Sequence, residues 1–491
     1  MNRSITRLAI VSLLLLAAVV AATTYWQTWA VGGLNDRQDN AIQRVSQLTV
    51  ERGKIIAGDG HTVMATNIAT TVGDQTLYIR TYPTGRLLSN VVGYSTQARS
   101  RTGLERSQND YLTAANAGLD SLVSRLSGST VKGNDLHLTV RPGAEYIAER
   151  ALGGKCGSVV ALDPRTGRVL VMATSPGYNP NQVEKDFRKI EATQAPCTPP
   201  APLLNRATSG LYAPGSTFKL VTAAAALDSG AFGPESHFFD PGYCIEYGKK
   251  VSNYADQNGP EKFGSITLSN ALVHSVNAVF CEIGKQLGPK TILSYAKRFG
   301  FYSVPPLETP AAERAASGLY NGSKLYQPKS NSDVDPGRFA FGQERLLATP
   351  LQMAMVVGAI ANGGIVMRPY VVDHVTSPDG KLVSATRREE LGPAIKPETA
   401  GQLTEMMEQV VARGTGGNAR IPGVRVAGKT GTAETGVPGI NTTWFVAFAP
   451  VEDPTVAIAV ALESQRGTGG GTAAPIAKAV MQALLRPTAN S

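Results

Sequence analysis

The longest uninterrupted apolar run lies near the N-terminus, where residues 8–26 carry no charged side chain. A run of this length predicts a membrane-spanning helix. Arg3 and Arg7 precede it, so the N-terminus is expected in the cytoplasm, and Trp26 and Trp29 suit the opposite membrane interface. A cleaved signal peptide is the alternative, but the length of the run favours a retained anchor over residues 1–29. Both interpretations export the rest of the chain.

Shorter patterns in residues 30–152 predict a small α+β unit. Alternating apolar positions over Leu136–Val140 indicate a strand, and a Pro-Gly turn separates this strand from an amphipathic helix. Further upstream, an apolar segment reads as a strand that enters a turn at Gly58–Gly60. No residues with visible chemistry gather here, so we expect this unit to serve as a platform.

Residues 153–491 mix helical and strand patterns. Strand patterns open the unit and recur near its end, at residues 157–174, 424–434, 442–450 and 455–464. Apolar helical patterns lie between and after them, at residues 216–230, 268–288, 349–364 and 475–485. The sequence thus predicts helices around a largely antiparallel sheet whose strands come from the two ends of the unit.

Composition narrows the class of protein and the kind of partner. The chain has 491 residues, of which 42% are hydrophobic and 17% are charged, values typical of a folded protein with more than one domain. Its net charge of +9 favours an acidic polymer, an anionic lipid surface or nucleic acid as a partner. Nucleic acid is the weakest of these, because the sequence contains no sustained Lys/Arg block and no regular basic–aromatic alternation.

The chain contains four cysteines and five histidines, which gives little support to a metal site. None of the cysteines forms a C-x-x-C pair, so no zinc or thioredoxin-type motif is predicted. Outside the membrane, cysteines can form disulfides. Cys244–Cys281 is the favoured pairing, because both residues flank one loop-to-helix segment. Four buried free thiols, which include Cys156 and Cys197, are the alternative.

The stretch "PGSTFK" places a serine where it could become a nucleophile. Pro214 and Gly215 interrupt the chain and an Ala-rich run follows, so Ser216 is expected at a helix N-terminus among free backbone N–H groups. Lys219 follows one turn later on the same face. A serine reacts when a base removes its proton, and a lysine is such a base when burial or a nearby cation lowers its pKa.

This spacing and the next candidate are weak when each is taken alone. S-x-x-K recurs at Ser129–Lys132 and Ser294–Lys297, where a helix cap and a solvated lysine are the ordinary interpretation. Ser275 and Asn277 offer a hydroxyl for proton relay and an amide for holding a substrate, but they need a bend or a helix end to face one site. "SQN" at residues 107–109 matches the same S-x-N spacing.

The third candidate, "AGKTGTAE", lies on a predicted strand. Lys429 and Thr430 can bind a carboxylate, and Gly431 leaves room for a substrate backbone because it has no Cβ. Thr432 can give its backbone N–H to an oxyanion hole beside that of Ser216. An edge-strand turn that contains a glycine is the plain alternative.

The order of the three stretches strengthens them, since S-x-x-K, S-x-N and K-T-G in this order are the signature set of penicillin-binding serine acyltransferases. The chain resembles the class B, or monofunctional, high-molecular-weight penicillin-binding proteins, and among them the actinobacterial penicillin-binding protein A branch. "RGKIIAGDG", "GLERSQNDYL" and "LTVRPGAEYIAERAL" resemble the N-terminal pedestal of the family. "GSVVALDPRTGRVLVMATSPGYNPN" and "WFVAFAP" resemble its transpeptidase domain. "GQER" at 342–345 replaces a frequent G-Q-G without affecting a catalytic residue.

The resemblance implies an α+β fold with a membrane anchor (1–29), a pedestal or dimerisation-like domain (30–152) and a serine transpeptidase domain (153–491). The last domain would contain a mainly antiparallel five-stranded sheet flanked by helices. The implied catalytic residues are Ser216 as nucleophile, Lys219 as its general base, Ser275 as proton relay to the departing D-alanine and Lys429 as a charge that tunes both. The implied substrate-binding residues are Asn277, Thr430, Gly431 and Thr432.

The implied activity is that of a peptidoglycan D,D-transpeptidase, which cross-links stem peptides in cell-wall synthesis and which β-lactams acylate. The resemblance favours a role in cell division. No metal, cofactor or nucleic acid is needed. The implied location is the cell membrane, with a single span and the catalytic domain on the extracytoplasmic side. No glycosyltransferase-sized unit precedes the transpeptidase region, so a separate glycosyltransferase and divisome proteins are the expected partners.

Three other functions stay open. A D,D-carboxypeptidase uses the same three motifs with water as acceptor. A β-lactamase or β-lactam sensor is the second, since "STFK" resembles class D enzymes, although their S-x-V motif differs at Asn277. The third is a non-catalytic scaffold of a cell-wall complex, which the intact Ser216, Lys219 and Lys429 oppose.

Overall fold

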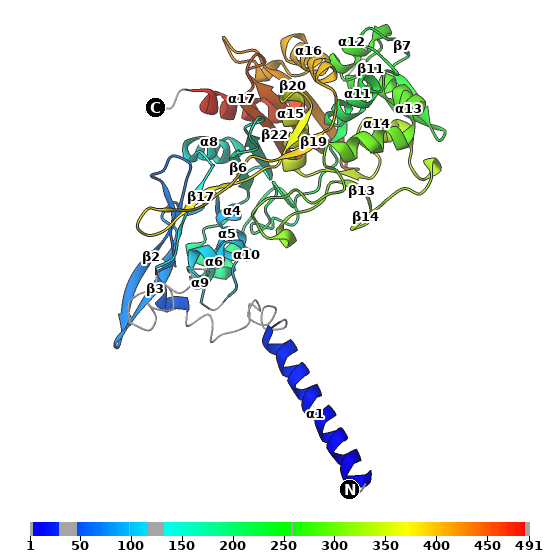
Figure 1. The fold of residues 1–491 in the computed structure, drawn as a ribbon. Coiled ribbons are helices and arrows are strands. Elements are labelled where there is room, and N and C mark those ends of the chain that lie inside the picture. The colour runs from blue at the N-terminus through cyan, green and yellow to red at the C-terminus, as the bar shows by residue number, and fades with distance from the viewer. Residues whose placement is uncertain (1–2, 29–46, 98, 116–131, 257–258, 487–491) are drawn as a thin grey trace.

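The structure is a computed structural model that describes residues 3–28, 47–97, 99–115, 132–256 and 259–486. Figure 1 shows an isolated N-terminal helix, a narrow lower unit and a broad upper unit. Helix α1 (Arg3–Thr28) contains an apolar stretch with a mean hydropathy of 2.4, none of it buried against the rest of the protein. Within the described ranges, it is the one helix long and apolar enough to cross a membrane, and a signal sequence would share these features.

The lower unit is built on a six-stranded sheet with the order β18-β17-β4-β1-β2-β3. Four strands come from the early part of the chain: β1 (Ile55–Ile56), β2 (Val63–Val72), β3 (Gln75–Thr81) and β4 (Asp135–Leu138). Two come from much later: β17 (Val372–Thr376) and β18 (Leu382–Ala385). Strand β17 pairs with β4 in an antiparallel arrangement. A late segment of the chain therefore completes a sheet that early residues begin (Figure 1). Short helices complete the unit: α4 (Ser89–Val92), α5 (Gly103–Ser107) and α6 (Asn109–Leu112).

The upper unit contains a five-stranded antiparallel sheet with the order β20-β21-β22-β5-β6. Its strands are β5 (Gly157–Leu162), β6 (Val169–Ser175), β20 (Ala427–Glu434), β21 (Asn441–Ala449) and β22 (Val456–Gln465). These strands come from the two ends of the unit, as their apolar patterns predict. The expected α+β fold with a mainly antiparallel five-stranded sheet is confirmed.

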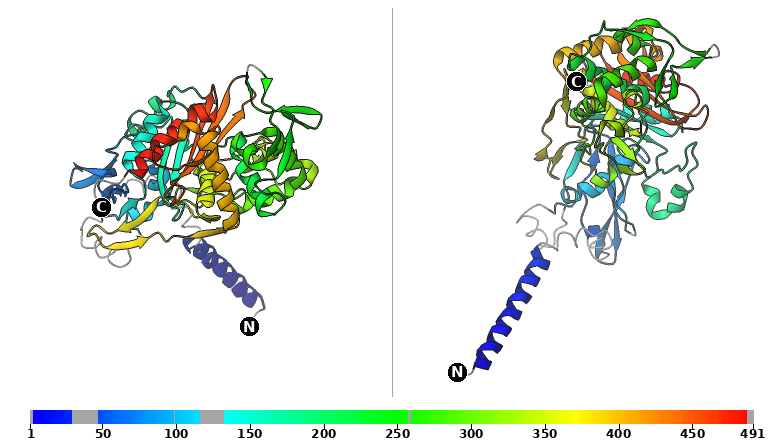
Figure 2. Two further views of the ribbon diagram at one scale, coloured as in Figure 1. Left: turned by 90° about the horizontal axis from the view of Figure 1, so that it is seen from above. Right: turned by 90° about the vertical axis from the view of Figure 1, so that its right-hand side faces the viewer.

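Both faces of this sheet are buried, because successive side chains of a strand point to opposite sides. Val159 faces one apolar core and Val160 faces the other. The first core is closed by helices α8 (Pro142–Leu152) and α17 (Gly469–Leu485). The second core is closed by helices α11 (Lys219–Asp228), α15 (Pro350–Ala361) and α16 (Pro397–Arg413). The view from above in Figure 2 shows helices on both sides of the sheet.

The chain passes between the two units more than once. Helix α8 lies before residue 153, where the transpeptidase domain is expected to begin, yet it packs on β6 and α17 of the upper unit. Strands β17 and β18 follow that residue, yet they belong to the lower sheet. The two units are therefore interleaved in sequence.

The chain breaks between two helices at the S-x-N stretch. The sequence predicts one helix over residues 268–288, but the structure has α12 (Leu268–Val273) and α13 (Asn277–Arg298). Ser275 has a φ of 58°, in the left-handed region that non-glycine residues seldom adopt. The apolar pattern continues through this break, so periodicity did not reveal it, but the bend that the stretch needs is present.

A small lobe packs on α13. It comprises residues 237–256 and 259–267 and is called the β-lobe below. Its strand pairs are β7 (His237–Asp240) with β12 (Gly264–Thr267) and β8 (Tyr243–Glu246) with β9 (Lys249–Ser252). A disulfide joins Cys244 of β8 to Cys281 of α13, so the favoured pairing is confirmed. Because Cys156 and Cys197 form a second disulfide, the alternative of four free thiols is wrong.

Candidate active site

Ser216 lies in a short 3₁₀ turn, Gly215–Thr217, directly before α11. The Thr217 hydroxyl donates to Pro214 O over 2.7 Å and closes this turn. The Ser216 side chain is half-buried, and among the described residues its hydroxyl has no hydrogen-bond partner. The helix start predicted from the Pro-Gly pair is therefore present, and it carries a free hydroxyl.

Lys219 begins α11 and is fully buried. Its Nζ donates to Ser275 O over 2.6 Å and to Asn277 Oδ1 over 2.8 Å. Burial, and then repulsion from Lys429, hold the pKa of Lys219 well below its ordinary value. In the described part of the chain no hydrogen bond joins Lys219 to the Ser216 hydroxyl. Such catalytic hydrogen bonds commonly tighten only when substrate is bound.

Lys429 comes from β20 and is also fully buried. Its Nζ donates to Ser275 Oγ over 2.8 Å and to Thr430 O over 3.0 Å. Burial lowers the pKa of Lys429 to about 7. The Ser275 hydroxyl also accepts a longer hydrogen bond, of 3.4 Å, from Lys219, so it lies between the two lysines. Because burial disfavours the charged form of a lysine, the pKa of each of these lysines lies below its ordinary value, which favours a role as proton acceptor.

Strand β20 lies against the turn that carries Ser216. A Cβ added to Gly215 would lie 2.9 Å from Thr432 O, which shows how closely the two segments approach. The structure thus brings the three candidate stretches, residues 216–219, 275–277 and 429–432, to one place. Each stretch alone is weak evidence for an active site, but their common location supports one.

The two threonine hydroxyls of β20 have partners that the sequence did not indicate. Thr430 Oγ1 lies 2.6 Å from Thr415 Oγ1, in the loop after α16. Thr432 Oγ1 accepts a hydrogen bond of 3.3 Å from the N–H of Gly469, the first residue of α17. The partners are separated by 15 and 37 residues along the chain, so no local pattern pointed to these contacts.

Gly431 is constrained by the protein itself as well as by any substrate. A Cβ at this position would lie 2.9 Å from Pro214 O, 2.9 Å from Thr217 Cγ2 and 3.0 Å from Trp444 Cβ. The missing side chain therefore allows β20 to approach the turn of Ser216, a requirement that adds to the room for substrate expected from the sequence.

We expect Gly431→Ala to lower the free energy of unfolding by about 1–3 kcal/mol, because backbone and side chains around the turn must move apart. The variant should also slow the reaction of Ser216 with an acylating probe. Gly401→Ala is the control, since a Cβ at this position of α16 meets nothing within 4 Å. Urea unfolding should show the control to be unchanged or more stable. Equal stability of both variants would contradict the proposed constraint.

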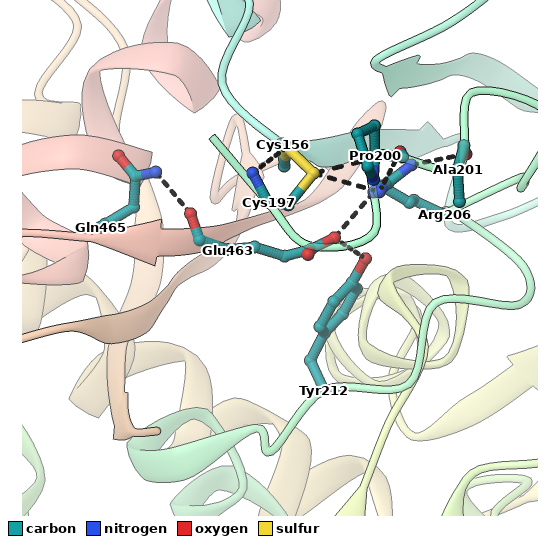
Figure 3. Close-up of a disulfide and its surroundings, with 8 residues drawn as sticks. All are labelled: Cys156, Cys197, Pro200, Ala201, Arg206, Tyr212, Glu463 and Gln465. Carbon is teal, nitrogen blue, oxygen red and sulfur yellow. Dashed lines mark hydrogen bonds and ion pairs between the residues drawn. A yellow bond between two sulfur atoms is a disulfide. The ribbon is translucent and has the colours of Figure 1, made fainter. Parts of the chain in front are cut away.

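A buried network holds the segment that leads to Ser216 (Figure 3). The Tyr212 hydroxyl and Arg206 Nε both donate to Glu463 Oε1, each over 2.7 Å. Arg206 Nη2 also lies 3.4 Å from the sulfur of Cys197, which is disulfide-bonded to Cys156. The network therefore ties the approach to the nucleophile to strand β22 and to the disulfide, a support that sequence reasoning missed.

One group of side chains within the described ranges has the composition of a metal site. Cys244, Glu246 and Cys281 place one ligand atom each within 4.8 Å of one another. The two sulfurs are joined in a disulfide, so they offer no thiolate to a metal ion. The chemistry of the candidate site rests instead on a serine hydroxyl, two basic lysines and backbone N–H groups, which together suit nucleophilic acyl transfer.

Comparisons with known proteins agree with this chemistry. Residues 157–482 match the penicillin binding protein transpeptidase domain, and residues 52–136 match the penicillin binding protein A dimerisation domain. The chain is 34% identical to the peptidoglycan D,D-transpeptidase PbpA of Mycolicibacterium smegmatis, over 99% of each chain. Its identity to the protein of the same name from Mycobacterium tuberculosis is 33%, again over 99% of each chain.

Solved structures extend the similarity to the fold. The ceftriaxone acyl-enzyme complex of penicillin-binding protein A from M. tuberculosis matches with a TM-score of 0.80 at 31% identity, over 90% of this chain and 100% of that one. The D,D-transpeptidase domain of a peptidoglycan glycosyltransferase from Eggerthella lenta matches with a TM-score of 0.77 at 34% identity, over 89% and 98%. By its sequence and its fold, the chain belongs to the penicillin-binding protein transpeptidase family, as a class B member similar to penicillin-binding protein A.

Proposed function

We propose that this protein is a peptidoglycan D,D-transpeptidase that forms an acyl-enzyme at Ser216 with a stem peptide ending in D-Ala-D-Ala. The observation that carries the proposal is the placement of a free serine hydroxyl one turn from the buried Lys219, whose pKa is lowered. Serine acylation needs a base that takes the hydroxyl proton, and burial suits Lys219 to this role because it lowers the pKa of the lysine. β-Lactams would acylate the same serine.

The first half-reaction breaks the terminal peptide bond. Ser216 Oγ attacks the carbonyl carbon of the penultimate D-alanine while Lys219 accepts the hydroxyl proton. Ser275, hydrogen-bonded to both lysines, passes a proton to the nitrogen of the departing D-alanine. Lys429 fixes the Ser275 hydroxyl and adds positive field. In the second half-reaction an acceptor amine attacks the ester and loses its proton to the same relay, which forms the cross-link and restores Ser216.

Substrate binding is assigned to the S-x-N and K-T-G-T stretches. Asn277 orients the donor peptide, while Thr430 and Thr432 hold its terminal carboxylate. The backbone N–H groups of Ser216 and Thr432 form the oxyanion hole, and the close approach of Gly215 to Thr432 supports this pairing. Such donors, fixed before the reaction, lower the barrier because they stabilise charge only as it develops.

The domain plan and location follow the same proposal. Helix α1 anchors the protein, residues 30–152 form the pedestal and residues 153–491 form the transpeptidase domain, with α8 and β17–β18 crossing between them. The catalytic domain lies on the extracytoplasmic side. Two disulfides support this location, because disulfides persist mainly in oxidising compartments. A separate glycosyltransferase and proteins of cell division are the proposed partners.

Product analysis tests the function against its alternatives. A transpeptidase given stem peptide and acceptor amine releases D-alanine and forms a dimeric product. A carboxypeptidase releases D-alanine without the dimer, and a β-lactamase rapidly releases opened drug. A scaffold would not be labelled by a fluorescent penicillin. Absence of labelling in the wild-type protein would reject the proposal.

The rate of penicillin acylation should rise with pH and then level off well below the ordinary pKa of a lysine. At low pH the buried lysines are protonated and no base is available, whereas deprotonation of Lys219 supplies it. The rising part of the pH profile, called the acid limb below, reflects the titration of the two lysines together. Lys429 has a pKa of about 7, and it repels the charge on Lys219. Stopped-flow labelling from about pH 5 to about pH 10 measures the limb. A rate that does not change with pH would contradict the assigned base.

A further inference from the structure

We propose that Asn253 of the β-lobe is a positioning residue for the acylation reaction, acting through Asn277 of α13. The inference rests on the proposed function, because Asn277 is a site residue only in that assignment. Asn253 itself lies outside the three active-site stretches. It is 6% exposed, so its side chain is committed to contacts within the protein.

Asn253 caps the helix that begins with Asn277. Its Oδ1 accepts a hydrogen bond of 3.0 Å from the N–H of Ala278, the second residue of α13. The first N–H groups of a helix have no partner within the helix, and Val276 at the N-cap position has no side-chain acceptor. The β-lobe therefore supplies from outside the cap that the local sequence lacks.

The orientation of the Asn253 amide is fixed by a buried carboxylate. Its Nδ2 donates to Asp240 Oδ1 over 3.0 Å and to Asp240 Oδ2 over 2.9 Å. Asp240 also accepts hydrogen bonds from Gly242 N and Phe263 N, over 2.8 and 3.0 Å. A carboxylate accepts hydrogen bonds, so the NH₂ group of the Asn253 amide, which donates them, must face Asp240. The oxygen of the same amide is thereby directed at Ala278.

The neighbouring residue of the β-lobe holds Asn277 directly. Asn277 Nδ2 donates to Ser252 O over 3.0 Å, while Asn277 Oδ1 accepts from Lys219 Nζ over 2.8 Å. Consecutive residues of the β-lobe, 252 and 253, thus bind consecutive residues of α13, 277 and 278. The disulfide between Cys244 and Cys281 fastens the β-lobe to the same helix one turn later. A continuous set of contacts therefore runs from Asp240 to the general base.

Loosening this set of contacts has two separate effects on the reaction. Misplacement of Asn277 and Lys219 should lower the plateau rate of acylation by about 10- to 100-fold. Asn277 Oδ1 also stabilises the ammonium form of Lys219, so its loss should move the acid limb of the rate to lower pH. Of the described residues, Lys429 on β20 is the charged group that acts on Lys219, while Ser275, between α12 and α13, and Asn277 of α13 present neutral groups.

The test measures the rate of penicillin acylation against pH in the full-length protein. Asn253→Ala should show both the lower plateau and the displaced acid limb. Lys285→Met is the matched control, because Lys285 also joins α13 to the β-lobe, at Ile245 O and Glu246, but two turns beyond Asn277. The control should change thermal stability without moving the acid limb. A folded Asn253→Ala protein with the wild-type plateau and limb would overturn the inference.

A second variant decides the matter if Asn253→Ala does not fold. Asp240→Asn leaves the shape of the side chain but removes one acceptor, so it should produce a smaller effect in the same direction. An unshifted limb and an unchanged plateau in a folded Asp240→Asn protein would also overturn the inference. Penicillin labelling of the wild-type protein distinguishes a failure of the proposed function from a failure of the role of Asn253. An unlabelled wild type rejects the proposed function, whereas a labelled wild type with normal variants rejects only the role of Asn253.

Discussion

Ser216→Ala is expected to abolish covalent labelling by penicillin while the fold survives. The substitution removes one half-buried hydroxyl that makes no hydrogen bond among the described residues, so its effect on stability should be small. The adjacent Thr217 hydroxyl cannot replace it, because this hydroxyl is buried and already donates to Pro214 O. Fluorescent labelling, mass spectrometry of the adduct and thermal unfolding measure the three parts of this prediction.

The chain offers a matched control for this variant. Ser294 and Lys297 repeat the S-x-x-K spacing on α13, but both side chains are exposed. Ser294→Ala should therefore be labelled as fast as the wild type. Persistent labelling of Ser216→Ala, or an adduct mapped to another residue in the wild type, would refute the assigned nucleophile.

Lys219→Met should slow acylation by about 10²- to 10⁴-fold, the usual contribution of a general base. Methionine has a similar length and no basic group, so it removes the proton acceptor and leaves the buried volume filled. The Ser216 hydroxyl then has to lose its proton to water or to a more distant group. Labelling rates over hours, compared with stopped-flow rates of the wild type, measure the loss.

The same variant should change how stability depends on pH. The folded-state pKa of Lys219 is lowered, so the unfolded chain binds more protons than the folded protein between that pKa and about pH 10.4. Stability of the wild type therefore rises with pH across this window. In Lys219→Met the rise should be smaller, whereas exposed Lys297→Met should retain it. A Lys219→Met protein with the wild-type rate of acylation would refute the role of Lys219 as the base.

Sequence predicted the parts of the fold that depend on local pattern. The Pro-Gly pair followed by an Ala-rich run marked the start of α11, because chain breakers and helix formers act over a few residues. Apolar strand patterns marked β5, β6 and β20 to β22 for the same reason. The three candidate stretches were recognised by their order along the chain, and the structure then supplied their common location.

Features that depend on distant contacts could not be predicted in this way. The break at Ser275 interrupts a continuous apolar pattern, and a left-handed serine leaves no compositional trace. Thr415 and Asn253 are ordinary polar residues until Thr430 and Ala278 are placed beside them. The network of Arg206 likewise requires a disulfide and a strand that lie far apart in the sequence. Such partners are fixed by the tertiary fold, which a single sequence does not display.

Strand β17 also has a consequence for how the newly made chain matures. Until residues 372–376 have left the ribosome, β4 presents an open edge with unpaired N–H and C=O groups. A protein truncated before this segment would expose that edge permanently and invite association with other chains. The six-stranded sheet of the lower unit is therefore completed only after much of the upper unit has been synthesised, which makes the two units dependent on each other during biogenesis.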